Sequence, residues 1–281
     1  MSKIIYLLIF GLSLLLFYWY FLKPKKAKEV HYLIHKDKRQ VLDISNAYDL
    51  YEDSKTLLVA HFGDTHFRSG HGPKKLNPLI RSTIAREPDI IVFTGDLIAN
   101  YESWPHHLTP TLVDKLKRLK APSGKFAILG NQDYVKDGQY FVQEVLKDAE
   151  FQPLVNESIF TAKEETAVHI VGMDDTILGH PVYEFDKKIA NWQLLLVHEA
   201  GHIEKVKSLL DFDLVLTGHP FKKRIFKKNQ NAPKFTDGLY QLGSKTLLSI
   251  FPKYEAGKIF LKTPTIYYYH LVKESNKKPT S

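Results

Sequence analysis

Cysteine is absent from this chain of 281 residues. Disulfide bonds, thiolate-based zinc sites and thiol catalysis are therefore excluded, and any bound metal must be held by His, Asp, Glu or Asn. Repeats and low-complexity tracts are also absent. The composition, 44% hydrophobic and 12% aromatic, is rich enough for a buried core and argues against overall disorder.

The positive charge is unevenly distributed. The formal net charge is +8, and one basic group lies at Lys222, Lys223, Arg224, Lys227 and Lys228. This group favours a phosphate or an anionic lipid as partner, although a solvated hairpin face explains it equally well. Because no basic stripe interleaved with aromatic residues is present, we expect no nucleic-acid partner.

The N-terminus carries a long apolar run. Ile4 to Leu22 contains no charged residue, and such a length can cross a bilayer core at roughly 1.5 Å per residue. Tyr18, Trp19 and Tyr20 lie near its end, as in an interfacial aromatic belt. A cleaved secretory signal is the rival interpretation, but no small-x-small cleavage site follows. We therefore predict an uncleaved single-pass anchor in the cell membrane, over residues 1–23.

Lysine placement bears on the membrane side. Lys3 precedes the apolar run, whereas Lys23, Lys25, Lys26 and Lys28 follow it. The positive-inside bias thus favours a main domain on the cytoplasmic side. Large domains can override this bias, so the extracellular side is the alternative.

The rest of the chain predicts a layered α/β domain. We interpret residues 24–52 as a tether and lead-in, 53–273 as the domain and 274–281 as a loose polar tail. From Thr56, continuous apolar runs alternate with amphipathic segments such as "LNPLIRSTIARE" and "HIEKVKSLLDF", which favours buried sheets connected by helices. Four apolar runs predict further strands before Val272: "GLYQLG", "TLLSIF", "GKIFL" and "TIYYYHLV".

Five predicted strands end in side chains that can bind a metal. These are Asp64 with His66, Asp96, Asn131, His198 and His219. Taken singly, each has an ordinary structural explanation, such as a helix N-cap or a turn. Together they are expected to converge on one rim of one sheet, where parallel strands end. Oxygen and imidazole ligands suit Mn²⁺, Fe²⁺ or Zn²⁺, and so many ligands predict two ions.

Several motifs carry a family resemblance. "GDTH", "TGDL", "LGNQD", "LVHE" and "TGHPF", in this order, resemble the calcineurin-like metallophosphoesterase superfamily from Thr56 to about Val272. "PDIIVFTGDLI", "LVNESIF" and "VGMDD" further resemble its bacterial branch with an N-terminal membrane segment. The resemblance implies a four-layer α/β/β/α sandwich and hydrolysis of a phosphomonoester, phosphodiester or diphosphate by a metal-activated hydroxide.

The resemblance also implies roles for individual residues. Asp64 and His66 would bind the first metal, Asp96 would bridge both ions, and the second would be completed by Asn131, His198 and His219. The substrate class that we expect is a phosphorylated lipid or another envelope compound, because the predicted anchor holds the site near a bilayer.

Two positions depart from the family pattern. Gln132 stands where the family has a histidine that contacts phosphate and protonates the leaving oxygen, and glutamine cannot supply that proton. Phe221 stands where the family has a histidine ligand of the first metal, which predicts a weaker first site. A degenerate ligand-binding or scaffold protein with low or no activity is therefore the alternative function.

Overall fold

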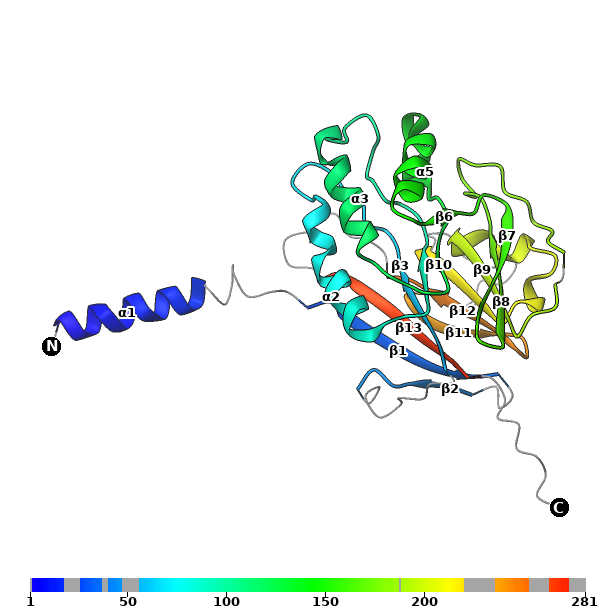
Figure 1. Ribbon diagram of the computed structural model, residues 1–281, viewed down its shortest axis with the longest axis horizontal. Coiled ribbons are helices and arrows are strands. Elements are labelled where there is room, and N and C mark those ends of the chain that lie inside the picture. The colour runs from blue at the N-terminus through cyan, green and yellow to red at the C-terminus, as the bar shows by residue number, and fades with distance from the viewer. Residues whose placement is uncertain are drawn as a thin grey trace, which may run out of the picture.

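Two β-sheets packed face to face form the centre of the molecule (Figure 1). The structure is a computed structural model that describes residues 2–17, 26–36, 40–46, 56–186, 188–219, 236–252 and 263–272. Phe221, the basic group that follows it and the predicted strand over residues 257–261 lie outside these described residues.

The first sheet has the strand order β2-β1-β13-β3-β4-β5-β6 among the described residues. Its strands are β1 (Lys28–His35), β2 (Gln40–Asp43), β3 (Leu57–Phe62), β4 (Ile90–Phe93), β5 (Lys125–Ala127), β6 (Gln152–Pro153) and β13 (Thr265–Val272). Strands β3 to β6 run parallel to one another, so their carboxyl ends meet at one edge.

The second sheet has the order β11-β12-β10-β9-β8-β7. Its strands are β7 (Glu157–Lys163), β8 (Thr166–Gly172), β9 (Trp192–Glu199), β10 (Leu214–His219), β11 (Gly238–Leu242) and β12 (Thr246–Ile250). Strands β8, β9, β10 and β12 are parallel. Nearly continuous burial along β9 and β10 agrees with the apolar runs expected of strands covered on both faces.

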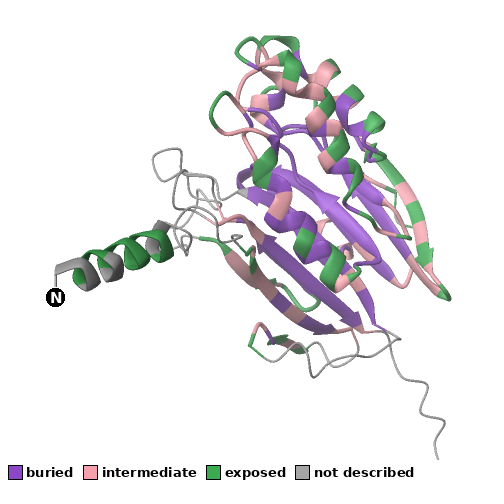
Figure 2. Cartoon of the chain, turned by 60° about the vertical axis from the view of Figure 1, so that its left-hand side comes forward, coloured by how far each residue is buried: buried purple, intermediate pink, exposed green. Residues whose placement is uncertain are grey.

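Helices cover the outer face of the first sheet. These are α2 (Asn77–Arg86), α3 (Thr109–Lys117) and α5 (Gly138–Asp148). The described residues also form the α-helices α1 (Ser2–Phe17), which is not part of this layer (Figure 1), and α4 (Asn131–Tyr134). Short 3₁₀ turns are η3 (Pro73–Leu76), η4 (His106–Leu108) and η5 (Val135–Asp137). Ile80 of α2, Leu112 of α3 and Val142 of α5 belong to the main core, together with inner residues of both sheets. Figure 2 shows the strands as the most buried part of the molecule.

The outer face of the second sheet is covered by 3₁₀ turns. The helix predicted over "HIEKVKSLLDF" is wrong in type, because these residues form η6 (Ala200–Lys205) and η7 (Leu209–Asp211). Its apolar residues Ile203, Val206, Leu209 and Phe212 pack under this sheet. Ile203 and Leu209 lie within the two turns, whereas Val206 and Phe212 follow them in extended backbone. This face of the second sheet, the expected fourth layer of the sandwich, is thus covered here by short 3₁₀ turns instead of a long α-helix.

The predicted domain boundary at residue 53 differs from the structure. Strand β1 pairs in parallel with β13 along its whole length, and β2 pairs with β1. Part of the predicted tether thus belongs to the first sheet. Residues 31, 33 and 34 are buried, which shows that the short patch "HYLI" contributes to the folded domain.

The described part of the predicted anchor is the helix α1. Its side chains at Ile9, Phe10 and Leu15 are exposed. No helix within the described residues is both long and apolar enough to cross a membrane. The predicted run from Ile4 to Leu22 extends beyond Phe17 into residues that the structure does not describe.

Glu29 connects β1 to the helix α2. Its carboxylate accepts hydrogen bonds from Ser82 Oγ at 2.8 Å and from Arg86 Nε at 3.0 Å. Burial alone would raise its pKa, but the hydrogen bonds from His31, Ser82 and Arg86 outweigh burial and lower the pKa of Glu29 to about 2. Because this folded-state pKa lies below the unfolded value of 4.5, the contribution to stability is complete above pH 4.5 and is lost as the pH falls toward 2.

Replacing Glu29 with glutamine is expected to lower the free energy of unfolding at pH 7 by about 1–2 kcal/mol, after allowance for partial solvent screening. The difference from the unchanged chain should shrink as the pH falls through that window. Chemical denaturation at a series of pH values measures it. Glu184→Gln, which removes a pair with Lys207 that is exposed on both sides, is the control and should leave the transition unchanged. An equal loss at pH 3 and pH 7 would contradict the prediction.

Candidate metal centre

The predicted ligands lie where the strands of both sheets end. Asp64 and His66 follow β3, Asp96 follows β4, and Asn131 begins α4 shortly after β5. From the second sheet, His198 lies near the end of β9 and His219 ends β10. Parallel pairing of β3 with β4 and of β9 with β10 gathers these ends at one edge of each sheet. The predicted convergence on one rim of one sheet is therefore wrong, because the ligands come from two sheets.

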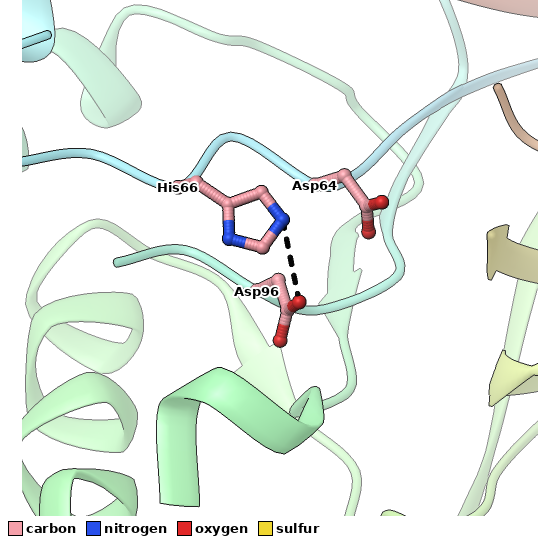
Figure 3. A group of neighbouring side chains, drawn as sticks. All are labelled: Asp64, His66 and Asp96. Carbon is pink, nitrogen blue, oxygen red and sulfur yellow. Dashed lines mark ion pairs between the residues drawn. The ribbon is translucent and has the colours of Figure 1, made fainter. Parts of the chain in front are cut away.

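Asp64, His66 and Asp96 form a compact group. One potential ligand atom from each lies within 4.8 Å of the others (Figure 3). Asp96 Oδ2 lies 3.4 Å from His66 Nε2 and also 3.4 Å from His198 Nε2. The carboxylate of Asp96 therefore stands between an imidazole beside the first sheet and one from the second, which is the arrangement that a bridging ligand needs.

The backbone of this group is strained. Asp64, His66 and Asp96 have φ values of 50°, 43° and 59°, in the left-handed region that non-glycine residues avoid at a cost of about 1–3 kcal/mol each. Two hydrogen bonds across the loops hold them, from Asp64 N–H to Gly95 O at 3.0 Å and from His66 N–H to Asp96 O at 2.9 Å. Strain of this kind accumulates at functional sites.

Two glycines allow the loops to approach each other. A Cβ atom at Gly130 would lie 2.3 Å from Asp96 Oδ1, and one at Gly95 would lie 2.5 Å from Gly130 N. Both distances are too short for any side chain. A glycine before a polar residue permits a sharp turn, and at Gly130 it also permits close packing against Asp96.

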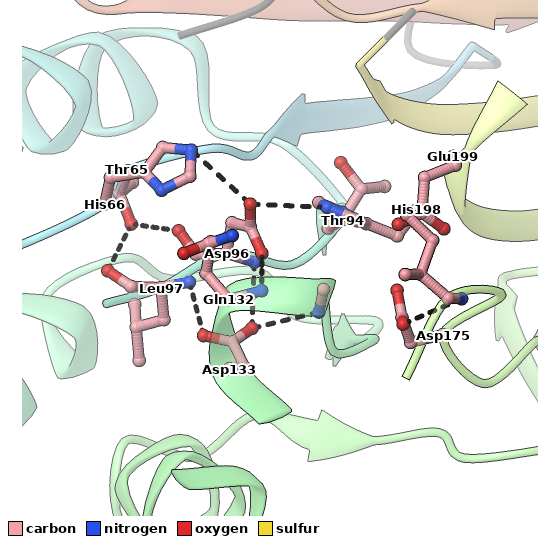
Figure 4. Close-up of polar contacts among 12 residues, drawn as sticks. Thr65, His66, Thr94, Asp96, Leu97, Gln132, Asp133, Asp175, His198 and Glu199 are labelled. Carbon is pink, nitrogen blue, oxygen red and sulfur yellow. Dashed lines mark hydrogen bonds and ion pairs between the residues drawn. The ribbon is translucent and has the colours of Figure 1, made fainter. Parts of the chain in front are cut away.

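His198 is fully buried and oriented by a backbone carbonyl. Its Nδ1–H donates to Thr94 O at 2.6 Å, which directs Nε2 toward Asp96 (Figure 4). Burial would lower the pKa of His198, but the Asp96 carboxylate outweighs it and raises that pKa well above the ordinary value. Conversely, burial would raise the pKa of Asp96, and the His198 and His66 imidazoles lower it to about 2. An ionised carboxylate beside directed imidazole nitrogens fits a divalent cation.

The metal-binding and catalytic roles of all the predicted site residues, including Asn131, Gln132 and His219, stay predictions. The backbone N–H of Gln132 donates to Asp96 Oδ1 at 2.8 Å, so the start of α4 contacts the centre. His219 pairs with Glu199 in the β9–β10 ladder, and its side chain lies outside the described part of the chain. Phe221 lies outside it as well.

Asp133 holds together the two loops that carry Asp96 and Gly130, a role that the sequence did not reveal. Its Oδ2 accepts hydrogen bonds from the backbone N–H groups of Asp96 at 2.8 Å and Gly130 at 3.0 Å. Its Oδ1 accepts from Leu97 at 2.9 Å and Ile98 at 3.4 Å. Burial and then the Asp96 charge raise the pKa of Asp133 to about 7. The only signal in the sequence is its place in "GNQD".

Replacing Asp133 with asparagine is expected to destabilise the protein by roughly 2–5 kcal/mol. In either orientation of the amide, its NH₂ group would face two buried N–H donors, and each unpaired donor costs about 1–3 kcal/mol. Chemical denaturation measures the loss. Asp114→Asn, on the exposed face of α3, is the control. Equal stability of the two variants would contradict the prediction.

A loop anchored by acidic residues borders the centre. Thr176 Oγ1 donates to Glu199 Oε2 at 2.6 Å, and the backbone N–H groups of Ile177 and Leu178 donate to Asp175 Oδ1 at 3.0 and 2.6 Å. Tyr134, which follows Asp133, donates its hydroxyl to Asp174. Burial, and after it the Asp175 carboxylate, raise the pKa of Glu199 to about 7.

Comparison with known proteins finds relatives that are all described as metallophosphoesterases. The chain is 29% identical over 198 residues to the uncharacterized metallophosphoesterase YkuE of Bacillus subtilis, which covers 66% of this chain and 68% of that protein. It is 28% identical over 209 residues to the uncharacterized metallophosphoesterase Cj0846 of Campylobacter jejuni, covering 70% of this chain. The match spans only about half of Cj0846, 53% of its length.

A third relative is the uncharacterized metallophosphoesterase YkoQ of Bacillus subtilis, 27% identical over 170 residues that cover 59% of this chain and 61% of that protein. The sequence profile described as "Calcineurin-like phosphoesterase" matches residues 57–223. This range is more than half of the chain and includes every predicted ligand from Asp64 to His219. The chain therefore belongs to the calcineurin-like phosphoesterase family.

Proposed function

We propose that this protein is a metal-dependent phosphoesterase whose centre is built around Asp96. The observation that carries the proposal is the convergence of His66 and His198, from different sheets, on one Asp96 carboxylate oxygen. A buried carboxylate needs positive charge beside it, and a divalent cation held between Asp96 and the two imidazoles would supply that charge. Members of this family use divalent metals, and the donor set here contains the oxygen and nitrogen ligands that such ions take.

The residues divide into ligands and supports. Asp64 and His66 would hold one ion, Asp96 would be shared, and Asn131, His198 and His219 would hold the other. Bound divalent ions supply an activated water for attack on phosphorus and positive charge opposite the phosphoryl oxygens. The chain itself fixes the ligand geometry. The Asp133 carboxylate accepts the backbone N–H of Asp96, and the Thr94 carbonyl accepts the Nδ1–H of His198.

Gln132 restricts the substrates. A glutamine can donate a hydrogen bond to a phosphoryl oxygen but cannot transfer a proton to a leaving oxygen. Esters whose leaving groups depart without protonation, such as aryl phosphoesters and diphosphates, should therefore be hydrolysed best.

We further propose that the N-terminal segment anchors the protein in a membrane, with the main domain on the cytoplasmic side. Supporting observations are the uncharged run from Ile4 to Leu22, the excess of lysines after it, and the exposed apolar side chains of α1. A phosphorylated lipid or envelope compound would then be the natural substrate. Protease treatment of intact cells tests the orientation, since digestion of the main domain from outside would contradict it.

The alternative is a degenerate member of the family that binds a ligand or acts as a scaffold. Gln132 and Phe221, each in place of a family histidine, favour it. This alternative predicts a single bound metal and no turnover. It therefore differs from the main proposal in both metal stoichiometry and activity, and two bound metal ions per chain would count against it.

Hydrolysis by the purified full-length chain tests the proposal. The protein is stripped with a chelator, supplied separately with Mn²⁺, Fe²⁺, Zn²⁺ or Co²⁺, and assayed on bis(p-nitrophenyl) phosphate and p-nitrophenyl phosphate. We expect turnover that returns with at least one metal. Turnover that does not depend on added metal, or none above an Asp96→Asn variant, would contradict the proposal for these substrates.

A further inference from the structure

A line of buried polar side chains runs from the second sheet through the first. Ser249 Oγ of β12 lies 2.6 Å from the hydroxyl of Tyr269 on β13, which lies 3.2 Å from Nδ1 of His61 on β3. The other ring nitrogen of His61, Nε2, lies 2.9 Å from Thr94 Oγ1. All four side chains are fully buried. The line thus ends at Thr94, whose backbone carbonyl orients His198.

Thr94 connects this line to His198 through its backbone. Its carbonyl accepts from His198 Nδ1–H at 2.6 Å. On one side of that carbonyl, the Thr94 N–H is held by Phe62 O at 3.1 Å, and on the other, Gly95 O is held by Asp64 N–H at 3.0 Å. Because Gly95 has a φ of 92° and offers little resistance to rotation, anchoring of Thr94 helps to fix the direction of its carbonyl.

Thr94 and His198 are closely packed against the backbone of two glycines. A Cβ atom at Gly63 would lie 2.5 Å from Thr94 Oγ1. One at Gly218 would lie 2.6 Å from His198 Nδ1 and 2.8 Å from Thr94 O. Both glycines therefore allow the hydrogen-bonded groups to sit against neighbouring backbone. A small rotation of Thr94 would change the contact made by His198.

Packing alone does not explain a histidine at position 61. The ring lies among apolar and aromatic residues, with its centroid 5.0 Å from that of Phe251, where a leucine would fill space without a desolvation penalty. Burial lowers the pKa of His61 to about 3, so the ring is neutral near pH 7. A neutral ring has one N–H and one lone pair, which suit the hydroxyls of Tyr269 and Thr94.

We propose that His61 is a positioning residue for the metal ligand His198, acting through Thr94. The proposal rests on the ligand role of His198 in the proposed function. Without His61, the buried hydroxyl of Thr94 loses its partner, and the carbonyl of Thr94 is less firmly directed. His198 Nε2 is then less well aimed at Asp96, and metal binding weakens.

Mn²⁺ titration of the full-length, metal-stripped chain tests the proposal. His61→Leu and Thr94→Val are expected to bind Mn²⁺ about 10–100-fold more weakly, as is typical when a group that orients a metal ligand is removed. His61→Gln, whose amide can reach the place of Nε2, should recover most of the affinity. Tyr267→Phe removes a hydroxyl from a neighbouring ring 6.4 Å from His61 and should bind Mn²⁺ like the unchanged chain.

A second readout separates positioning from stability. In metal-free protein, the Nδ1–H proton of His198 should give a downfield NMR signal that exchanges slowly with water, assigned by its loss in His198→Gln. We expect this signal to broaden or vanish in His61→Leu and Thr94→Val and to persist in Tyr267→Phe. A purely structural role would lower the unfolding temperature of these variants but leave the signal and the affinity of the folded protein unchanged.

The outcomes distinguish this proposal from the proposed function. If the unchanged chain binds Mn²⁺ and His61→Leu binds it equally well with the signal intact, the positioning role is wrong. If the unchanged chain binds no metal, the proposed function is wrong, and the NMR signal still decides whether His61 orients His198. Should His61→Leu fail to fold, Thr94→Val, which preserves size and shape, tests the same hydrogen bond from its other side.

Discussion

Replacing Asp96 with asparagine is expected to lower metal affinity and phosphoesterase activity by roughly 10³-fold or more. Groups that merely orient a metal ligand are worth about 10–100-fold, and Asp96 would be a ligand of both ions. The asparagine keeps the shape and still accepts the Gln132 N–H, but it lacks the negative charge that faces His66 and His198 at 3.4 Å. Mn²⁺ titration and hydrolysis of bis(p-nitrophenyl) phosphate measure the two losses.

A buried aspartate away from the centre provides the matched control. Asp213 pairs with Lys36 at 2.8 Å and accepts from Gln193 N–H, at the start of β10 rather than at its end. Asp213→Asn removes a buried charge of the same kind and should alter stability without altering metal affinity. Comparable loss of Mn²⁺ binding in both variants would show that the effect of Asp96→Asn is a general consequence of losing a buried charge.

Replacing Gln132 with histidine is expected to raise the hydrolysis of alkyl phosphoesters by about 10²–10⁴-fold, the usual contribution of a general acid. The backbone of Gln132 already contacts Asp96, and its side chain is partly exposed, so an imidazole at this position can meet a bound ester. The same change should have little effect on p-nitrophenyl esters, because their leaving group needs no proton.

Two substrates with different leaving groups are therefore needed to interpret this variant. The ratio of kcat/KM for an alkyl ester to that for a p-nitrophenyl ester should rise in Gln132→His. Gln132→Asn, which also lacks a transferable proton, is the control and should not raise the ratio. A ratio that stays constant in Gln132→His would mean that this position takes no part in leaving-group protonation.

Much of the organisation of the domain follows from local patterns in the sequence. The runs "DIIVFTG" and "WQLLLVH" form buried strands because continuous apolar sequence suits sheets covered on both faces. The meeting of Asp64, His66 and Asp96 can be expected because the parallel strands β3 and β4 end at one edge of their sheet. That rule does not bring His198 to them, because β9 belongs to the second sheet. The resemblance of these motifs to the family indicates the two-sheet fold as well.

Other features depend on contacts that no local pattern records. Strand β1 joins the sheet because β13, more than two hundred positions later, pairs with it, and its own sequence resembles a polar lead-in. Asp133 accepts from four N–H groups, three on the consecutive residues Asp96, Leu97 and Ile98 and one on Gly130. The buried contact of His61 with Thr94 connects that histidine to the centre, and no local pattern in the sequence records it.

Metal stoichiometry combined with turnover is the sharpest test of a metal-dependent centre around Asp96. The full-length chain is saturated with Mn²⁺, separated from free ions, and measured for metal content and for hydrolysis of bis(p-nitrophenyl) phosphate. We predict two Mn²⁺ per chain at saturation, the weaker ion at the Asp64–His66 site, and turnover that both metal removal and Asp96→Asn abolish. A chain that binds no Mn²⁺, or whose binding is unchanged by Asp96→Asn, would contradict this prediction.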